Sequence, residues 1–371
     1  MELPPPRERI YSLDAIRALA TIFVIVVHTH AYFFSYESHG ILYSFFAIIG
    51  NIGVPFFIIL TGYLMFHRDY ENTEYLHKYL AKNLLPLIIA YEFWIVTWNL
   101  FLYTHILPFA PQSWTSIIKA ALFVGDTNSA LWYLPMIIAV YLGMPLLATA
   151  YRRISSPMYI QIVFVALLLC GVVIPSVDIF YAYAGTSLNI NSVLKMNVFG
   201  ATVWGESVWM IYLFAGYAVY KGKLKRFSAK RLMVAGVLMP LFLICIMTYI
   251  CGVVEGNHHS FILLVLLSVS AFELLTRTED FLKNHAYCKK IVHTVSNISF
   301  TIYMLHILVS GTLYYLLSKS QKTIDFIGMS AGMTNIFLYA VFIAVVVFII
   351  YLFAQIFQKN RFIKRYILLM K

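Results

Sequence analysis

The chain alternates between long apolar stretches and short polar connections along almost its whole length. Stretches of about 20 apolar residues are long enough to cross the hydrocarbon core of a bilayer as helices. They occur at residues 13–34, 43–66, 84–103, 131–150, 158–175, 203–220, 232–251, 260–275, 292–317 and 335–357. Because a helix satisfies its own backbone hydrogen bonds in lipid, the pattern predicts an all-α polytopic membrane protein with about ten transmembrane helices.

Composition agrees with this class and leaves little room for a second domain. The 371 residues are 61% hydrophobic and 12% charged, whereas a soluble domain of this size needs far more polar surface. No polar segment is long enough to fold by itself. We therefore expect a single transmembrane domain over residues 1–371.

The positive charges are distributed unevenly between the two sides of the predicted membrane. Of the 27 Lys and Arg residues, all but Lys119, Lys195, Lys319 and Lys322 fall on one side. Cytoplasmic loops carry such an excess, so the N- and C-termini are predicted to be cytoplasmic in a bacterial inner membrane. The net charge of +11 then belongs to loops beside the bilayer, and no nucleic-acid partner is expected.

Three ionisable residues interrupt the first apolar stretch, namely Asp14, Arg17 and His28. Such groups are costly at membrane depth and suggest a function by default. Arg17 and His28 are eleven positions apart, so their side chains share one helix face, about 16 Å apart along the axis. Asp14 precedes Arg17 by three residues, where a carboxylate can pair with a guanidinium. Ser12 is the expected N-cap of this helix.

His28 is the best candidate for a general base. An imidazole titrates near neutrality and can accept the proton of a hydroxyl group. Arg17, nearer the cytoplasmic end, could bind a phosphate or an amide of a charged cosubstrate. Each residue has a simpler alternative role: His28 could bond a backbone carbonyl of a neighbouring helix, and Arg17 could extend to the lipid headgroups.

Two further ionisable residues lie at membrane depth. Glu206 is expected near the outer end of the sixth stretch, and His306 about midway along the ninth. Either could face the same cavity as His28, or could serve helix packing or a water-filled cavity instead. The four cysteines lack the spacing of metal ligands, so no metal site is expected.

Several segments resemble the motifs of one protein family. Residues 12–20, Ser-Leu-Asp-Ala-Ile-Arg-Ala-Leu-Ala, with His28 beyond them, are similar to the opening motif of the acyltransferase-3 family of membrane O-acyltransferases. Later segments match in order: 54–64 (Val-Pro-Phe-Phe-Ile-Ile-Leu-Thr-Gly-Tyr-Leu), 131–134 (Leu-Trp-Tyr-Leu) with Tyr141 and 145–147 (Pro-Leu-Leu), 214–217 (Phe-Ala-Gly-Tyr) and 298–306 (Ile-Ser-Phe-Thr-Ile-Tyr-Met-Leu-His). The resemblance covers essentially the whole chain.

The resemblance implies an enzyme that moves an acyl group from cytoplasmic acyl-CoA, with acetyl-CoA as the expected cosubstrate, to a hydroxyl of a cell-surface or lipid-linked glycan. It implies that His28 is catalytic and that Arg17, with Asp14 beside it, binds the donor. The chain is most similar to the stand-alone members that acetylate surface polysaccharides such as the enterobacterial common antigen. No tightly bound cofactor is implied, and a homo-oligomer is compatible with the pattern.

One departure concerns the donor loop after the second span. Many relatives carry an Arg-x-x-Arg pair there, whereas this chain has Lys78 and Lys82. Lysine is a point charge rather than a two-pronged hydrogen-bond donor, which weakens the expectation that these two residues bind the donor in the same way. Trp132, Glu206 and His306 are the expected acceptor-binding residues.

Two other classes of protein remain compatible with the intramembrane charges. A proton-coupled transporter or a glycan export module could use Arg17, His28 and Glu206 along a pathway. The chain has no internal repeat, whereas many transporters are built from one. Binding of acyl-CoA by the purified protein would separate the enzyme from both alternatives.

Overall fold

Helices dominate the computed structural model, which describes residues 9–103, 114–122, 131–186, 197–198, 201–202, 207–251, 258–320 and 333–370. The helices are α1 (Tyr11–Thr29), α2 (Tyr36–Asn51), α3 (Gly53–Met65), α4 (Thr73–Tyr79), α5 (Leu85–Tyr103), α6 (Trp114–Ala121), α7 (Tyr133–Arg153), α8 (Pro157–Leu168), α9 (Ile174–Tyr183), α11 (Val208–Tyr220), α12 (Ala229–Arg231), α13 (Met239–Cys251), α14 (Ile262–Thr276), α15 (Glu279–Asn284), α16 (Ala286–Asn297), α17 (Ser299–Ser318) and α19 (Met333–Phe357). Short 3₁₀ or π turns extend or join them: η1 (His30–Tyr32), η2 (Leu80–Leu84), η3 (Leu169–Val173), η4 (Leu232–Leu238), η5 (His258–Ser260) and η6 (Ile363–Ile367). The strands β1 (Asn197–Val198) and β2 (Ala201–Thr202) form a small antiparallel pair.

Eight helical segments of the described chain are long and apolar enough to span a membrane: Tyr11–Tyr32, Gly40–Met65, Thr73–Asn99, Tyr133–Arg153, Pro157–Tyr183, Ala229–Cys251, Ser299–Ser318 and Met333–Phe357. Two shorter apolar helices, α11 and α14, have 13 and 15 residues. All ten lie where the hydrophobic pattern predicts spans. The prediction of an all-α polytopic membrane protein is confirmed.

Two predicted spans differ from the structure in their extent. The ninth is divided, because α16 ends at Asn297 and α17 begins at Ser299, with Ile298 at φ −99° and ψ 9° between them. The fifth continues beyond Pro175 to Tyr183, because the π turn η3 comes directly before α9. A regular α-turn would bring the proline ring against the carbonyl four residues earlier, and a wider turn relieves that clash.

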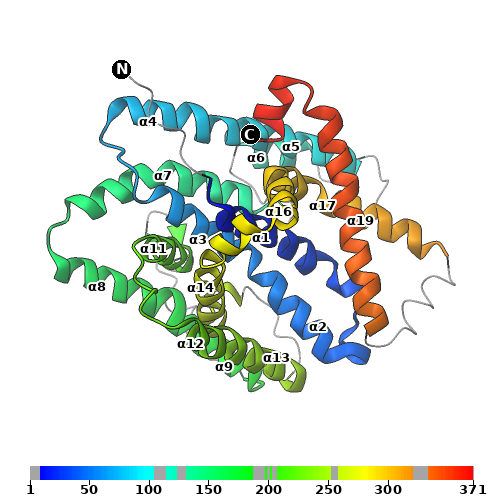
Figure 1. Ribbon diagram of the computed structural model, residues 1–371, viewed down its shortest axis with the longest axis horizontal. Helices are drawn as coiled ribbons and strands as arrows, with labels where there is room; N and C mark the ends of the chain where they lie inside the picture. The colour runs from blue at the N-terminus through cyan, green and yellow to red at the C-terminus, as the bar shows by residue number, and fades with distance from the viewer. Residues whose placement is uncertain are drawn as a thin grey trace.

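Helix α1 lies in the middle of the molecule, among helices from distant parts of the chain (Figure 1). It packs against α2, α3, α14, α16 and α17. Its apolar residues Ile16, Ala20 and Ile25 are completely buried. The helix that carries Arg17 and His28 is therefore held on several sides, which fixes where these two side chains lie.

The start of α1 is capped from outside rather than by Ser12. Ser12 lies inside the helix, so the predicted N-cap is wrong. Instead the carboxylate of Glu279 on α15 accepts hydrogen bonds from the backbone N–H groups of Tyr11 (3.1 Å) and Ser12 (2.7 Å). The first N–H groups of a helix lack internal partners and attract negative charge, so one distant carboxylate satisfies both.

Helices α3 and α11 pack unusually close, at two glycines that belong to the family-like motifs. A Cβ added to Gly62 would lie 2.1 Å from the carbonyl oxygen of Leu213, and one added to Gly216 would lie 2.0 Å from that of Ile59. Small residues allow membrane helices to approach backbone to backbone, where van der Waals contact stabilises them. The glycines in residues 54–64 and 214–217 thus serve the packing of the scaffold around α1.

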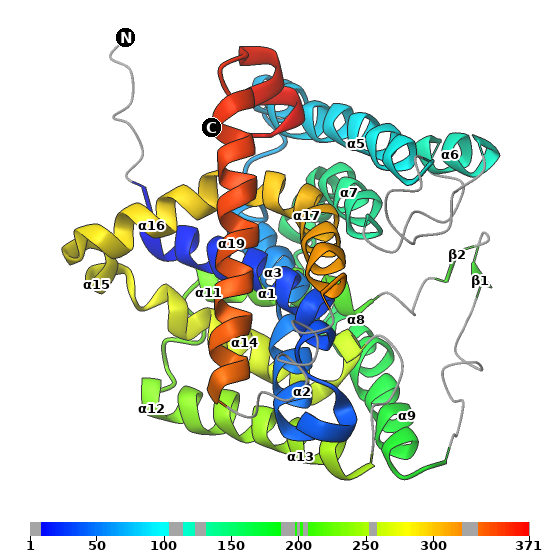
Figure 2. The same ribbon diagram turned by 90° about the vertical axis from the view of Figure 1, so that its right-hand side faces the viewer.

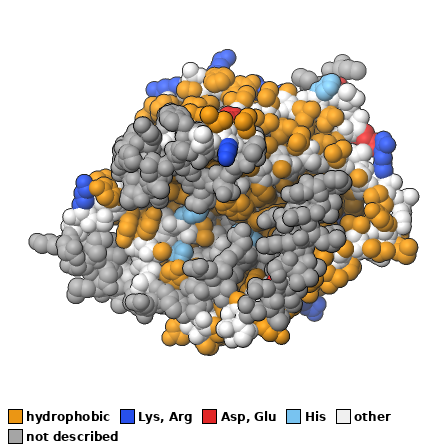
Figure 3. All heavy atoms as spheres, turned by 180° about the vertical axis from the view of Figure 1, so that it is seen from behind, with side chains coloured by type: hydrophobic (Ala, Val, Ile, Leu, Met, Phe, Trp, Pro, Cys, Tyr) orange, Lys and Arg blue, Asp and Glu red, His pale blue; other side chains and the backbone are white. Residues whose placement is uncertain are grey.

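The exterior is largely apolar, as lipid contact requires. Figure 3 shows hydrophobic side chains over much of the described surface on one face of the molecule, and exposed large apolar residues are frequent on α8, α13 and α19. At one end, the C-terminal turn η6 packs against α5 (Figure 2). The indole Nε1 of Trp94 donates to the carbonyl of Ile367 at 3.0 Å and holds this turn in place.

Candidate active site

Asp14 organises the N-terminal half of α1 through three polar contacts. The carboxylate is buried. It accepts hydrogen bonds from Nε of Arg9 at 2.5 Å and from the hydroxyl of Ser296 on α16 at 2.7 Å. Nη1 of Arg17 lies 3.8 Å from the same carboxylate. The predicted pairing of Asp14 with Arg17 is present, but Arg9 makes the shorter contact.

Arg17 is only partly neutralised by these neighbours. Its Nη1 donates to the hydroxyl of Ser296 at 3.4 Å, which is a long hydrogen bond. Within the described residues, no hydrogen bond or ion pair involves its Nε or Nη2. A guanidinium presents five N–H donors, so most of the hydrogen-bonding capacity of Arg17 is available to a ligand.

A cavity of about 380 Å³ opens beside Arg17 and is strongly basic. Its lining includes Arg9, Arg17, Lys82 and Arg365, with no Asp or Glu among the described residues that form it. Four cations around one volume favour an anionic ligand such as a phosphate. The other predicted donor residue, Lys78, is exposed on α4 and does not line this cavity.

Aromatic rings connect this basic cavity to the two histidines. Tyr133 and Tyr303 line the cavity, and their ring centroids are 5.5 Å apart. The ring of Tyr303 lies 5.8 Å from that of His306, which in turn lies 5.3 Å from that of His28. A continuous row of rings therefore runs from the basic cavity to His28, using residues of α1, α7 and α17.

His28 and His306 form a close pair with unequal environments. His306 is 1% exposed, whereas His28 remains accessible although protein atoms surround most of it. Nδ1 of His306 lies 2.7 Å from the backbone carbonyl of Tyr303. A carbonyl oxygen only accepts, so this nitrogen carries the proton and Nε2 is left as an acceptor. Among the described residues Nε2 has no partner.

The remaining predicted acceptor residues lie elsewhere or beyond the described chain. Trp132, directly before α7, has its ring centroid 5.9 Å from that of Trp209 and 6.2 Å from that of His259. These three rings form a cluster where α7, α11 and the turn before α14 meet. Glu206 lies outside the described residues.

Sequence reasoning missed several residues of the cavity. Arg365 reaches it because η6 folds back onto α5, and no local pattern in the C-terminal segment predicts that return. Tyr303, in contrast, could have been found from the sequence. It lies three residues before His306 in the motif at residues 298–306, and this spacing puts the two side chains on one helix face. Among the described residues no His, Cys, Asp and Glu side chains gather as a metal site.

Comparison with known proteins identifies the family of the chain. The model of the acyltransferase-3 family, described as an acyltransferase domain, matches residues 10–355. The chain therefore belongs to this family. No solved structure matches the chain.

A curated protein of Enterococcus faecalis, described as an amino-acid racemase, is similar to one part of the chain. It is 29% identical over 126 residues, which cover 33% of this chain and 16% of that protein. The similarity thus concerns a small part of a much longer protein, and its described activity stays with that protein.

Proposed function

We propose that this protein is an O-acyltransferase of the bacterial inner membrane that moves an acyl group, with acetyl-CoA as the donor, onto a hydroxyl of a cell-surface or lipid-linked glycan. The observation that carries the proposal is the row of rings that joins the basic cavity to the pair of His28 and His306. Such a transfer requires a site that binds an anionic donor and a side chain that accepts a proton.

The donor side is supported by charge and by position. The phosphates of acyl-CoA are polyanionic, and the basic cavity concentrates four cations. Arg17 lies about three helical turns before His28 on the same face of α1, since the helix is continuous from Tyr11 to Thr29. A donor anchored by its phosphates at Arg17 could extend its thioester along the tyrosines toward His28.

The chemical step follows from the two imidazoles. The unprotonated nitrogen of His28 takes the proton of the glycan hydroxyl while the hydroxyl oxygen attacks the thioester carbonyl carbon. The new C–O bond forms, the C–S bond breaks, and the proton passes from His28 to the departing sulfur of CoA. His306 positions His28, because its Nε2 can only accept a hydrogen bond and would hold the protonated nitrogen of His28.

The acceptor side rests on the aromatic cluster of Trp132, Trp209 and His259. The cluster lies at the ends of α7 and α11 that are farther from the basic loops. By the distribution of positive charge, these ends are on the outer side of the membrane. Aromatic rings with a polar edge suit a partly apolar, hydroxyl-rich ligand such as a sugar. Trp132 is half-buried there, so part of its ring is available for contact.

The experiment uses cells that lack the protein and cells that express it or its variants, with mass spectrometry of their surface glycans. The wild-type protein should restore acetylated glycan. His28→Gln should lower acylation by about 10²–10⁴-fold, because an amide keeps a hydrogen bond but cannot act as a base. Acetyl-CoA binding by the purified variant, measured by calorimetry, should be unchanged.

His293→Gln is the matched control, because His293 is exposed on α16 and does not line the basic cavity. It should acylate normally. Near wild-type acylation by His28→Gln at equal membrane levels would show that the base has been misassigned. Identical glycans with and without the protein would refute the assignment of a glycan as acceptor. A wild-type protein that does not bind acetyl-CoA would refute the assignment of the donor.

The family membership does not favour the alternative of a proton-coupled transporter or glycan export module. Such a protein needs a pathway but no site for an acylated nucleotide. The four cations of the basic cavity support a site for the phosphates of such a donor, and the cavity is lined by residues of α1, α5, α7, α16, α17 and η6.

A further inference from the structure

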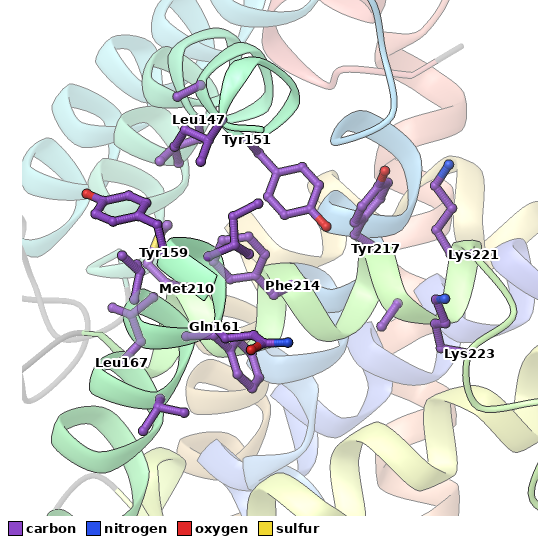
Figure 4. Close-up of a pocket in the computed structure, with 17 residues that line it drawn as sticks. Leu147, Tyr151, Tyr159, Gln161, Leu167, Met210, Phe214, Tyr217, Lys221 and Lys223 are labelled. Carbon is purple, nitrogen blue, oxygen red and sulfur yellow. The ribbon is translucent and has the colours of Figure 1, made fainter. Parts of the chain in front are cut away.

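A second and larger cavity lies on the membrane side of α7, α8 and α11. It has a volume of about 760 Å³ and is partly open, and Figure 4 shows the residues that line it. Its lining shares no residue with that of the basic cavity. The inference drawn from it therefore goes beyond the proposed transfer reaction and does not depend on it.

The walls of this lateral groove are almost entirely apolar. Figure 4 shows Tyr151, Phe214 and Tyr217 around its interior, with Leu147 at the upper left and Leu167 at the lower left. The rings of Tyr151 and Tyr217 meet edge to face at 5.5 Å. None of the residues of α8 is fully buried, so the side chains that it presents to the groove beside α7 and α11 remain accessible. Surfaces of this kind contact hydrocarbon chains in a bilayer.

One end of the groove is positively charged. Lys221 and Lys223 line it directly after the end of α11, and both are exposed. Nζ of Lys221 lies 5.4 Å from the ring centroid of Tyr217, which holds this ammonium over the apolar walls. The groove lining includes no Asp or Glu among the described residues. By the distribution of positive charge this end is cytoplasmic.

We propose that the lateral groove binds an anionic phospholipid of the cytoplasmic leaflet. One acyl chain lies between α8 and α11, and the phosphate lies against Lys221 and Lys223. Basic pockets between transmembrane helices on the cytoplasmic side bind anionic headgroups, because apolar contact and charge act together there. The acyl chain of a zwitterionic lipid would contact the apolar walls equally well, but its headgroup would be attracted much less strongly by the two lysines.

Lipid retention by the purified full chain tests the proposal. Native mass spectrometry would follow titration with dioleoyl phosphatidylglycerol and, separately, dioleoyl phosphatidylcholine. The wild type should retain phosphatidylglycerol more strongly. Lys221→Gln combined with Lys223→Gln should weaken this retention by about fivefold for each lysine removed. Lys225→Gln with Lys230→Gln is the matched control, because both lysines are exposed in the segment that follows α11 and neither lines the groove.

A second variant tests the apolar part without changing charge. Ala150→Trp should fill the groove and abolish retention, whereas Ala139→Trp, on an exposed face of the same helix, should not. Thermal unfolding in detergent would confirm that both variants fold. Excess acetyl-CoA should leave lipid retention unchanged, because the basic cavity is separate.

Three results would overturn the proposal. Equal loss of phosphatidylglycerol in the Lys225 and Lys230 control would mean that surface charge alone attracts the lipid. Equal retention of the two lipids by the wild type would remove the role of the lysines. Displacement of the lipid by acetyl-CoA would assign the lysines to the soluble donor instead.

Discussion

His306 is held in one tautomer by the backbone of its own helix, and that determines what it can offer to His28. Its Nδ1 donates to the carbonyl of Tyr303, so its Nε2 is a hydrogen-bond acceptor. The centroid of its ring lies 5.3 Å from that of His28. The sequence could predict that Arg17 and His28 share a helix face, because helical periodicity decides it. It could not predict that His306 faces His28, because that contact depends on how α17 packs against α1. Nor could it predict Arg9 as the nearest partner of Asp14.

The role of His306 as a positioning residue can be separated from a merely structural one. His306→Phe should lower kcat by about tenfold, the value of the one hydrogen bond that Nε2 of His306 is proposed to accept from His28 during the reaction, with little change in the KM for acetyl-CoA. His306→Gln should recover part of this loss, since an amide can donate to Tyr303 and accept from His28. Steady-state kinetics in proteoliposomes measures both. Equal activity of the two variants would argue that His306 only fills space.

Arg17 and Lys78 offer a direct test of the donor site. Arg17→Ala should weaken acetyl-CoA binding by about tenfold or more, because a charge-assisted hydrogen bond to phosphate is lost. Lys78→Ala should change it little, since Lys78 does not line the basic cavity. Calorimetry in detergent at two salt concentrations gives the affinities, and the wild-type affinity should fall with salt. The reverse order of effects would move the donor site to α4.

At the scale of elements, the sequence predicted the ten apolar spans but not how neighbouring helices end and meet. The positions of the ten spans follow from hydrophobic length, which is a local property. The break at Ile298 and the continuation past Pro175 depend on single backbone turns that apolar periodicity does not register. The close contact of α3 with α11 could be predicted only in part. The glycines of the motifs indicate that some helix approaches closely there, but only the structure shows which helix it is.

Close packing between these helices should make Gly216 intolerant of any side chain. Gly216→Ala places a methyl group 2.0 Å from a backbone oxygen, and overpacking of this kind should cost about 1–3 kcal/mol of stability. Gly143→Ala, on α7, meets nothing within 4 Å and should be neutral or slightly stabilising. Thermal unfolding in detergent compares them. An unchanged melting temperature for Gly216→Ala would mean that α3 and α11 can move apart at no cost.

On the scale of the whole molecule, the fold separates a basic side from an aromatic one. The basic cavity with Arg17, Lys82 and Arg365 belongs to the side that carries most Lys and Arg residues. The cluster of Trp132 and Trp209 lies at the opposite ends of α7 and α11. A soluble donor and an exported acceptor would thus approach from different compartments and meet near His28.

This orientation can be tested by cysteine labelling in intact cells. Single cysteines at Lys119 and Lys319 should react with an impermeant thiol reagent, whereas those at Arg152 and Lys223 should not. The background variant replaces the four native cysteines, which are all free thiols. Permeabilised cells, in which all four sites should react, provide the control. The opposite labelling pattern would place the basic cavity outside the cell and exclude a cytoplasmic donor.

For the proposed reaction, the uninterrupted course of α1 from Tyr11 to Thr29 sets a minimum length for the acyl donor. In that proposal the anion rests at Arg17 while the carbonyl to be attacked stands beside His28, about 16 Å away along the helix axis. Acetyl phosphate, whose anionic group is bonded directly to the acyl group, cannot occupy both positions at once. A long flexible arm between phosphate and thioester satisfies the distance. The choice among activated acyl compounds would then depend on the distance between their phosphate and their acyl carbonyl. The spacing along α1 would exclude compounds in which this distance is too short.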